Sequence, residues 1–358
     1  MSPERAAANA FDLGGDIIDI KPLGRGLIND TFLVKSSSRN AVLQRINRRA
    51  FPEPELIMQN LRALSDYCRE RQPDAALALP SILSTRAGGD FLVDERGDFW
   101  RVLSYIDNTV ALETVANPRQ AEAVGAALGR FHSLASGLDT KRLHATRPRF
   151  HKTPAYFERF ATVAAQTKDQ LASADLNWCV EFAHARRDIV SVLEDAKERG
   201  ELSLRVIHGD PKVDNFLFDA RAQNVVSLID LDTVQPGLVH YDIGDCLRSC
   251  ANPAGESPKN VADARFDLAI GRALLKRYLA ETRRLLTPQD IAYLYDAIRL
   301  IPFELGLRFL TDHLEGDVYF KTERRGHNLH RATVQFRLTE DIERNADAIQ
   351  STITALTR

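Results

Sequence analysis

The segment 206–219 and the apolar run behind it constrain the fold of this chain more than any other stretch. The first reads VIHGDPKVDNFLFD, and the second, VVSLI at 225–229, leads directly into Asp230. Short apolar runs bounded by polar residues are typical of buried strands. Asp210 then lies on the loop after one strand, Asn215 opens a second strand and Asp230 ends a third. The pattern predicts three oxygen-bearing side chains gathered at the ends of neighbouring strands.

Phosphoryl-transfer chemistry uses these residue types at this spacing. The acceptor hydroxyl must be held in line, its proton must be accepted, and a hard cation must offset the charge on the phosphate oxygens. Asp210 suits the role of base. Asn215 and Asp230 suit Mg²⁺, which prefers oxygen ligands and takes only one or two protein groups beside waters and phosphates. The kinase pattern HRDxxxxN followed by a metal-binding Asp is matched, except that Gly209 replaces Arg. Asp and Asn also occur in ordinary turns, but all three at this spacing favour a catalytic site.

Neighbouring residues are expected to support this loop. Lys212, two residues beyond Asp210, is assigned to offset the charge of the transferred phosphate, with a solvated lysine as the alternative. His208 is expected to brace the metal-binding turn by bonding to backbone. Asp242 and Asp245 are expected to open a helix and to bond back to the catalytic loop.

At these residues the chain resembles the aminoglycoside phosphotransferase and choline kinase superfamily, the small-molecule relatives of the protein kinases. More narrowly, HGDPKVDN at 208–215 together with LIDLDTVQPG at 228–237 resembles the N-acetylhexosamine 1-kinase branch. The resemblance covers most of the chain. It implies an α+β, two-lobed protein-kinase-like fold, with a small strand-rich N-terminal lobe at 1–107 and a larger, mainly helical lobe at 108–358. It also implies ATP and Mg²⁺ as cofactors.

A glycine-bearing turn between two predicted strands is the expected cover for the nucleotide phosphates. It contains Gly24, Gly26 and Asn29. Glycines allow backbone N–H groups to approach a phosphate with no Cβ in the way. Two glycines also begin many ordinary hairpins, so a simple turn is the alternative. Its place at the front of a chain with the Asp210 motif favours the phosphate loop.

The next predicted strand, AVLQRI at 41–46, departs from the kinase pattern, in which it carries a lysine that contacts the phosphates. Gln44 and Arg45 are the candidates to replace it, and alternation allows only one of them to face the cleft. Arg45 is favoured because of its charge, with a solvent-facing arginine as the alternative. By resemblance, adenine is expected to contact the backbone at the hinge after the next hairpin, at Ser104, Tyr105 and Ile106.

The remainder of the chain is predicted to be helical, because apolar residues recur there at helical spacing. The predicted helices cover 118–134, 154–172, 177–197, 263–284, 288–310 and 336–356.

The stretch 302–320 is the candidate acceptor pocket. A sugar pocket needs planar polar groups for vicinal hydroxyls and an aromatic wall. Arg308, Asp317 and Tyr319 supply these types, and the stretch resembles the sugar-kinase branch. Glu304 and Arg308 stand four apart, so an exposed ion pair is the alternative explanation for them.

The favoured acceptor is a sugar, with the anomeric hydroxyl of an N-acetylhexosamine as the expected target, and this choice rests on resemblance alone. A kinase for an aminoglycoside, choline or another amino alcohol stays open. So does a pseudokinase that binds nucleotide without turnover, because the strand lysine is absent.

Composition excludes some classes of partner. A net charge of −2 with 44% hydrophobic residues gives no electrostatic case for nucleic acid or a membrane surface. Four cysteines without a CxxC pair predict reduced thiols. The N-terminus lacks the apolar core of a signal peptide, and no run of about 18 apolar residues occurs. A cytoplasmic protein is therefore expected, of unpredicted oligomeric state.

Overall fold

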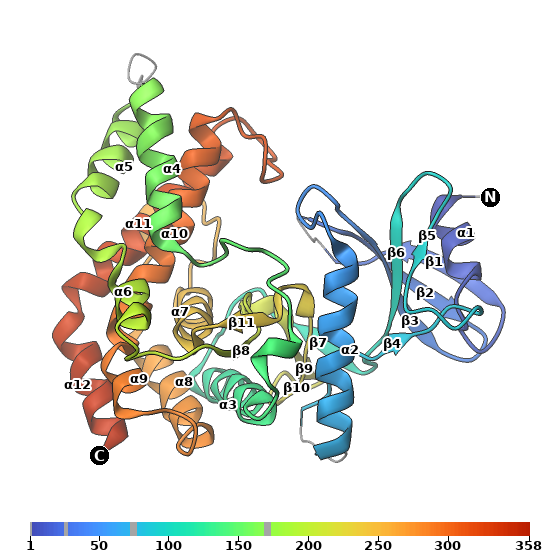
Figure 1. Cartoon of the computed structure of the whole chain (residues 1–358). Helices are drawn as coiled ribbons and strands as arrows, with labels where there is room; N and C mark the ends of the chain where they lie inside the picture. Colours follow the sequence, from blue (N-terminus) through green and yellow to red (C-terminus); the bar gives the residue numbers. More distant parts are fainter. Residues whose placement is uncertain (1, 25–27, 72–76, 168–172) are drawn as a thin grey trace.

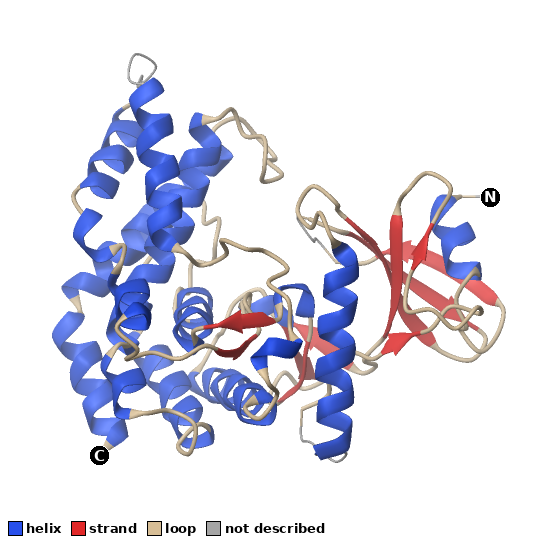
Figure 2. Ribbon diagram, in the orientation of Figure 1, coloured by secondary structure: helices blue, strands red, loops and turns tan. Residues whose placement is uncertain are grey.

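A six-stranded antiparallel sheet occupies the N-terminal part of the chain (Figures 1 and 2). The computed structural model describes residues 2–24, 28–71, 77–167 and 173–358. The strands follow the order β1-β2-β3-β6-β4, and β5 pairs with β6. Their bounds are β1 Ile17–Pro22, β2 Asp30–Ser36, β3 Asn40–Ile46, β4 Ile82–Leu83, β5 Leu92–Val93 and β6 Phe99–Ser104. Figure 1 shows α1 (Pro3–Asn9) on the outer side of this sheet and α2 (Pro54–Arg71) on the side toward the rest of the chain.

The two faces of this sheet meet different surroundings, because neighbouring residues of a strand point to opposite sides. Leu43 and Val102 pack with α1 and Phe11 in a small apolar core. Gln44 and Arg101, which are paired across β3 and β6, lie on the opposite face, where Arg101 reaches Asp232 of the later chain. Alternation thus decides which polar side chains of the sheet face the helical part.

Two smaller sheets carry the loops of the predicted motif. One has the order β10-β9-β7 and the other pairs β11 with β8. Their bounds are β7 Thr109–Ala111, β8 Arg205–Ile207, β9 Phe216–Asp219, β10 Val225–Leu228 and β11 Gln235–Gly237. The segment with Asp210 connects β8 to β9, and Asp230 follows β10, as the apolar runs predict. The chain leaves the large sheet after Ser104, and β7 already pairs with β9, which supports our proposal of a lobe boundary at 107/108.

Helices make up most of the chain after β7. They are α3 Pro118–Ala135, α4 Thr153–Gln166, α5 Ala174–His184, α6 Val192–Glu198, α7 Val239–Cys250, α8 Leu268–Glu281, α9 Pro288–Ala292, α10 Leu294–Leu314, α11 His327–Arg344 and α12 Ala346–Thr357. Short 3₁₀ turns lie between them at η1 Thr140–Arg142, η3 Arg187–Ile189, η4 Val213–Asn215, η5 Leu231–Thr233 and η6 Val261–Asp263. Gly125 lets α3 approach α8 closely, since a Cβ there would lie 2.1 Å from the carbonyl oxygen of Leu274. The two-lobed α+β class expected from the sequence is confirmed.

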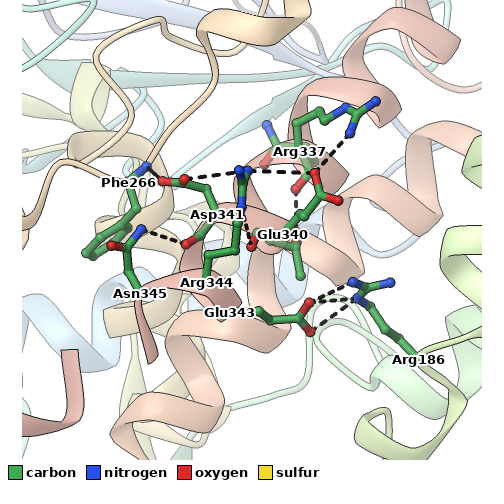
Figure 3. A network of polar contacts seen from close by, with 10 residues as sticks. Arg186, Phe266, Arg337, Glu340, Asp341, Glu343, Arg344 and Asn345 are labelled. Atoms are coloured by element: carbon green, nitrogen blue, oxygen red, sulfur yellow. Dashed lines mark hydrogen bonds and ion pairs between the residues drawn. The ribbon is translucent and has the colours of Figure 1, made fainter. Parts of the chain in front are cut away.

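Three of the predicted helices are wrong as single elements. The stretch 177–197 divides into α5, η3 and α6, 288–310 divides into α9 and α10, and 336–356 divides into α11 and α12. At the break between α11 and α12 the Asn345 side chain donates to the carbonyl of Asp341 at 2.8 Å, which satisfies the end of α11. Figure 3 shows how this end is held: Asp341 accepts from the backbone N–H of Phe266 at 2.8 Å, and Arg186 forms an ion pair with Glu343 at 2.7 Å. Periodicity continues across such a break, because both helices bury one face in the same core.

No helix in the described ranges combines the length and the apolar character needed to cross a membrane.

Candidate active site

The loop after β8 has a backbone conformation that only glycine accepts easily. Gly209 has a φ of +87°, and a Cβ there would lie 2.7 Å from the carbonyl oxygen of Thr233. The Thr233 hydroxyl donates to the carbonyl of His208 at 2.8 Å. An arginine, which the kinase pattern has at this position, would not fit. The substitution in the motif therefore follows from the close approach of the η5 turn.

Hydrogen bonds of the Asp242 and His208 side chains to the backbone hold the loop after β8 in place. Asp242, in the first turn of α7, accepts from the backbone N–H of His208 at 2.7 Å and of Gly209 at 2.8 Å. His208 donates through Nε2 to the carbonyl of Ile229 at 2.9 Å, and its Nδ1 accepts from the N–H of Asp210. Burial lowers the pKa of His208, so the ring is neutral in this role. His208 and Asp242 thus brace the loop as expected, whereas Asp245 pairs with Arg248 at 2.7 Å instead.

The predicted trio comes together at the strand ends. The Asn215 side chain donates to the backbone carbonyl of Asp210 at 2.7 Å, and the backbone carbonyl of Asn215 accepts from the N–H of Ile229 at 2.9 Å. Asp230 has a left-handed backbone conformation, with a φ of 62°. Lys212 extends its Nζ to 3.9 Å from Asp210 Oδ2. Asp210, Lys212 and Asp230 therefore line one cavity, whereas Asn215 is buried, bonds to the backbone of Asp210 and is not part of that lining in the described structure.

The electrostatics of these carboxylates suit a base and a cation site. Burial raises the pKa of Asp210 to about 7, with Lys212 acting in the opposite direction. Asp210 in turn raises the pKa of the Lys212 ammonium, which stays charged. Burial, followed by the charge of Asp232, raises the pKa of Asp230 to about 6. A carboxylate with a pKa near neutrality is matched to proton transfer at physiological pH.

Asp230 and Asn215 fit a Mg²⁺ ion by their chemistry. Within the described residues, the Asp230 carboxylate contacts no hydrogen-bond donor and no cation, and the Asn215 side-chain oxygen also has no donor. A bound cation would offset the two adjacent charges of Asp230 and Asp232. The described ranges hold no cluster of three or more His, Cys, Asp or Glu side chains suited to a metal. Mg²⁺ needs no such cluster, because waters and substrate phosphates complete its shell.

A cavity of about 160 Å³ opens at this point. One wall comes from β2, β3 and the turn before them. The floor comes from the loop after β8 and from η5. The opposite wall comes from the loop before α4, from α10 and from the segment after α10. The side chains that line these three parts include Ile28, Asn29, Thr31 and Gln44; Asp210, Lys212, Asp230 and Asp232; and Arg147, Phe150, His151, Glu304, Arg308 and Phe320. Asp210 thus lies between an N-terminal half and a half lined by aromatic rings and arginines.

Residues 19–285, more than half of the chain, match the model of the phosphotransferase enzyme family. The chain belongs to this family. An aminoglycoside phosphotransferase from Alicyclobacillus acidocaldarius has a TM-score of 0.65 and 15% identity, over 99% of this chain and 97% of its own. A choline kinase from Cryptosporidium parvum has a TM-score of 0.54 and 15% identity, over 95% and 92%. Spectinomycin phosphotransferase, solved with ADP and spectinomycin, has a TM-score of 0.54 and 12% identity, over 92% and 95%.

This phosphotransferase therefore has the two-lobed kinase-like fold, and the expected membership of the chain in the superfamily is confirmed. Family membership makes it an enzyme that transfers a phosphoryl group to a hydroxyl acceptor.

Arg45 of β3, which the sequence favours as the replacement for the kinase lysine, is not part of the cavity lining in this phosphotransferase. Arg45 forms ion pairs with Asp30 at 2.6 Å and Asp98 at 3.1 Å and lies over the ring of Trp100, away from the cavity. Gln44 is the neighbour that lines the cavity, because alternation turns it to the other face of β3. The geometry therefore does not support the expected contact of Arg45 with a nucleotide phosphate.

The other expected nucleotide contacts are only partly positioned for that role. Gly24 has a φ of +74° and, with Asn29, lines a separate open hollow; Gly26 lies outside the described residues. Asn29 also reaches the main cavity, but its amide donates to Asp232 at 2.8 Å and its oxygen accepts from the N–H of Asn47 at 3.0 Å. The turn is thus tied to the η5 segment by its own side chain.

The hinge residues end β6 as expected, but their backbone is partly engaged. The N–H of Ser104 donates to the carbonyl of Ser81 at 2.8 Å, so it is not free for a base. The carbonyl of Ile106 accepts from the Thr109 hydroxyl at 2.8 Å. Tyr105 lies between them. A contact to adenine at this hinge stays a prediction.

On the acceptor side, only part of the expected set lines the cavity. Arg308 does so, and lies over the rings of Phe150, Tyr156 and Phe320 at 5.3, 5.4 and 5.5 Å from their centroids. The Tyr319 hydroxyl lies at the edge, where Arg147 donates to it at 2.6 Å.

Asp317 is committed elsewhere. It has a φ of 59° and accepts from the Asn328 side chain of α11 at 2.9 Å, and it is not part of the cavity lining in the described structure. Its expected contact with the acceptor is not supported by the geometry.

Three residues of the site were missed from the sequence. Arg101 pairs with Asp232 behind Gln44. Arg147 and His151 come from the irregular loop before α4. His151 contacts Glu304 at 3.0 Å through Nδ1 and the carbonyl of Gly209 at 2.8 Å through Nε2, so Glu304 supports the catalytic loop and is not in an exposed pair. A loop without periodicity gave no signal for these contacts.

Proposed function

We propose that this phosphotransferase is an ATP- and Mg²⁺-dependent sugar kinase whose acceptor is the anomeric hydroxyl of an N-acetylhexosamine. The observation that carries the proposal is the position of Asp210 between the two halves of one cavity. The half with Asp230 suits a nucleotide and its cation. The half with Arg147, Arg308 and aromatic rings suits a polar ring with flat faces. A cytoplasmic location is part of this proposal.

The residues then act on an acceptor held in line with the γ-phosphorus. Asp210 accepts the proton of the acceptor hydroxyl as its oxygen bonds to phosphorus and the bond to the ADP oxygen breaks. Asn215 and Asp230 would hold Mg²⁺, which would supply positive charge to the phosphate oxygens. Lys212, at 3.9 Å from Asp210, offsets charge on the transferred group. ADP in the spectinomycin phosphotransferase structure supports the use of a purine nucleotide here.

The side chains around the cavity favour a sugar over a cationic amino alcohol. A cationic acceptor would meet Arg147 and Arg308, whose charges face the same half of the cavity as Phe150. A pseudokinase without turnover is disfavoured because Asp210 and Asp230 line one cavity and Asn215 is bonded to the backbone of Asp210.

The proposal is tested with the purified chain, ATP and Mg²⁺ against a panel of acceptors. The panel holds N-acetylglucosamine, N-acetylgalactosamine, glucose, choline, ethanolamine and kanamycin, and ADP release is followed for each. We expect acceptor-dependent turnover with the sugars and a product whose ³¹P spectrum is that of an anomeric phosphate. Turnover with the amino alcohols alone, or bound nucleotide without transfer to any acceptor, would contradict the proposal.

A further inference from the structure

Two arginines contact the same aromatic ring in the acceptor half of the cavity. The guanidinium carbons of Arg147 and Arg308 lie 4.4 and 5.3 Å from the centroid of Phe150. Both side chains line the cavity that contains Asp210. They come from different elements, the loop before α4 and the middle of α10, so their meeting is a product of the fold.

Neither guanidinium has a carboxylate within ion-pair distance among the residues that the structure describes. Glu304 is the nearest candidate, but its two oxygens are occupied by His151 at 3.0 Å and by the Thr153 hydroxyl at 2.8 Å. Asp245 is paired with Arg248. Neither arginine therefore has a carboxylate in direct contact. Burial acts to lower the pKa of Arg308, but nearby Tyr156 and Glu304 outweigh it and raise that pKa.

Most N–H donors of the pair are also unused. Each guanidinium carries five N–H donors, and the bond from Arg147 to the Tyr319 hydroxyl at 2.6 Å is the single hydrogen bond that either makes within the described ranges. Aromatic faces attract the charge but do not replace oxygen acceptors. Burial and the charge of Arg308 lower the pKa of Arg147, which reflects the cost of holding two cations together.

We propose that Arg147 and Arg308 bind an oxyanion carried by the acceptor, so that the substrate class is acidic sugars that bear a carboxylate or a phosphate. The planar fork of arginine matches the two oxygens of such a group, and an anion between the two guanidinia would neutralise both. The inference rests on the proposed sugar-kinase function and deepens it. It also explains why a wall built for a hydroxyl acceptor carries two cations.

Binding and turnover are compared for matched sugars. The neutral member is N-acetylglucosamine, and the acidic members carry a carboxylate on O3 or a phosphate on O6. Calorimetry with saturating ADP measures affinity without turnover, and ATP with Mg²⁺ gives kcat/KM for each sugar. We expect at least one acidic member to bind about tenfold or more tightly than the neutral one, because hydrogen bonds to charged groups contribute roughly 1.5–3 kcal/mol.

Variants of Arg147 and Arg308 test whether the preference for acidic sugars depends on these two side chains. Arg308→Gln and Arg147→Gln are each expected to weaken acidic-sugar binding about tenfold, with little effect on the neutral sugar and on ADP. Arg308→Lys, which keeps the charge, should retain part of the preference. The matched control is Arg149→Gln, an exposed arginine of the same loop, which should change nothing. Thermal midpoints establish that each variant is folded.

Equal affinity for neutral and acidic sugars in the unaltered chain would overturn the inference, whatever the variants do. An equal loss for both kinds of sugar in the arginine variants would overturn it as well. Tight binding of an acidic sugar without phosphoryl transfer to any sugar would instead support the arginine site and contradict the proposed sugar-kinase function. Transfer to neutral sugars without a preference for acidic ones would support the proposed sugar-kinase function and contradict the arginine site.

Discussion

Arg101 of β6 and Asp232 of η5 form a buried ion pair that joins the N-terminal sheet to the segment after Asp230. Their side chains are 1% and 3% exposed. Arg101 also donates to Gln44 at 2.7 Å, and Asp232 accepts from Asn29 at 2.8 Å. The pair thus fixes both the strand that lacks the kinase lysine and the turn before β2 against the catalytic segment.

Replacing Arg101 should destabilise the protein strongly. Arg101→Met leaves the Asp232 charge buried without its partner, which costs about 3–5 kcal/mol in comparable cases. The free energy of unfolding is measured by urea denaturation. Arg45→Met on the adjacent strand is the control: its ion pairs are 40% exposed on the arginine side, so a loss below about 1 kcal/mol is expected. An equal decrease in the free energy of unfolding for the two variants would show that the buried Arg101–Asp232 pair stabilises the fold no more than the exposed pairs of Arg45.

Asp230→Asn should separate stability from activity. The ionised Asp230 carboxylate is disfavoured by burial and by Asp232, and asparagine tolerates the left-handed backbone conformation well. In the absence of Mg²⁺ the variant is therefore expected to unfold at a higher temperature. Its turnover should fall and require more Mg²⁺, because one ligand has lost its charge. A lower thermal midpoint at neutral pH, or an unchanged Mg²⁺ requirement, would count against the assigned role.

The His151–Glu304 pair should make stability depend on pH. Burial alone would lower the pKa of His151, but Glu304 and the bond to Gly209 more than offset it and raise the pKa above 6.5. Since the folded state binds the proton more tightly than the unfolded state, the contribution is complete below about pH 6.5 and is lost as pH rises through the folded pKa. The loss of stability in His151→Asn should be larger at pH 6 than at pH 9. Asparagine suits the φ of 57° at this position, and an equal loss at both pH values would exclude the linkage.

The sequence alone was sufficient to place the candidate catalytic residues at the ends of strands. It was not sufficient to identify the residues that line the walls of the cavity. Asp210, Asn215 and Asp230 could be placed because each borders an apolar run that can only be a buried strand here. The sequence could not decide between Gln44 and Arg45. Alternation along a strand places their side chains on opposite faces of the sheet, but it does not say which face lines the cavity. Arg45 was favoured only because of its charge. Asp98 and Asp30, which hold Arg45, are distant in sequence or lie on another strand.

Arg101 and Arg147 illustrate a second limit. An arginine in a strand usually lies at the surface, so nothing local marks Arg101 as buried against Asp232, 131 positions later. Arg147 lies on a loop whose course is fixed only by tertiary contacts. Long-range contacts of this kind decide the shape of the acceptor pocket, whereas the catalytic loop is a local feature of the chain.

The role of Asp210 as the base is tested most directly by Asp210→Asn in a single-turnover assay with γ-labelled ATP and a sugar that the unaltered protein phosphorylates in the acceptor panel. We expect transfer to fall by roughly 10²–10⁴-fold, the usual contribution of a positioned base, while ADP and ATP affinities change little. Near-normal transfer by a folded Asp210→Asn protein would contradict the account.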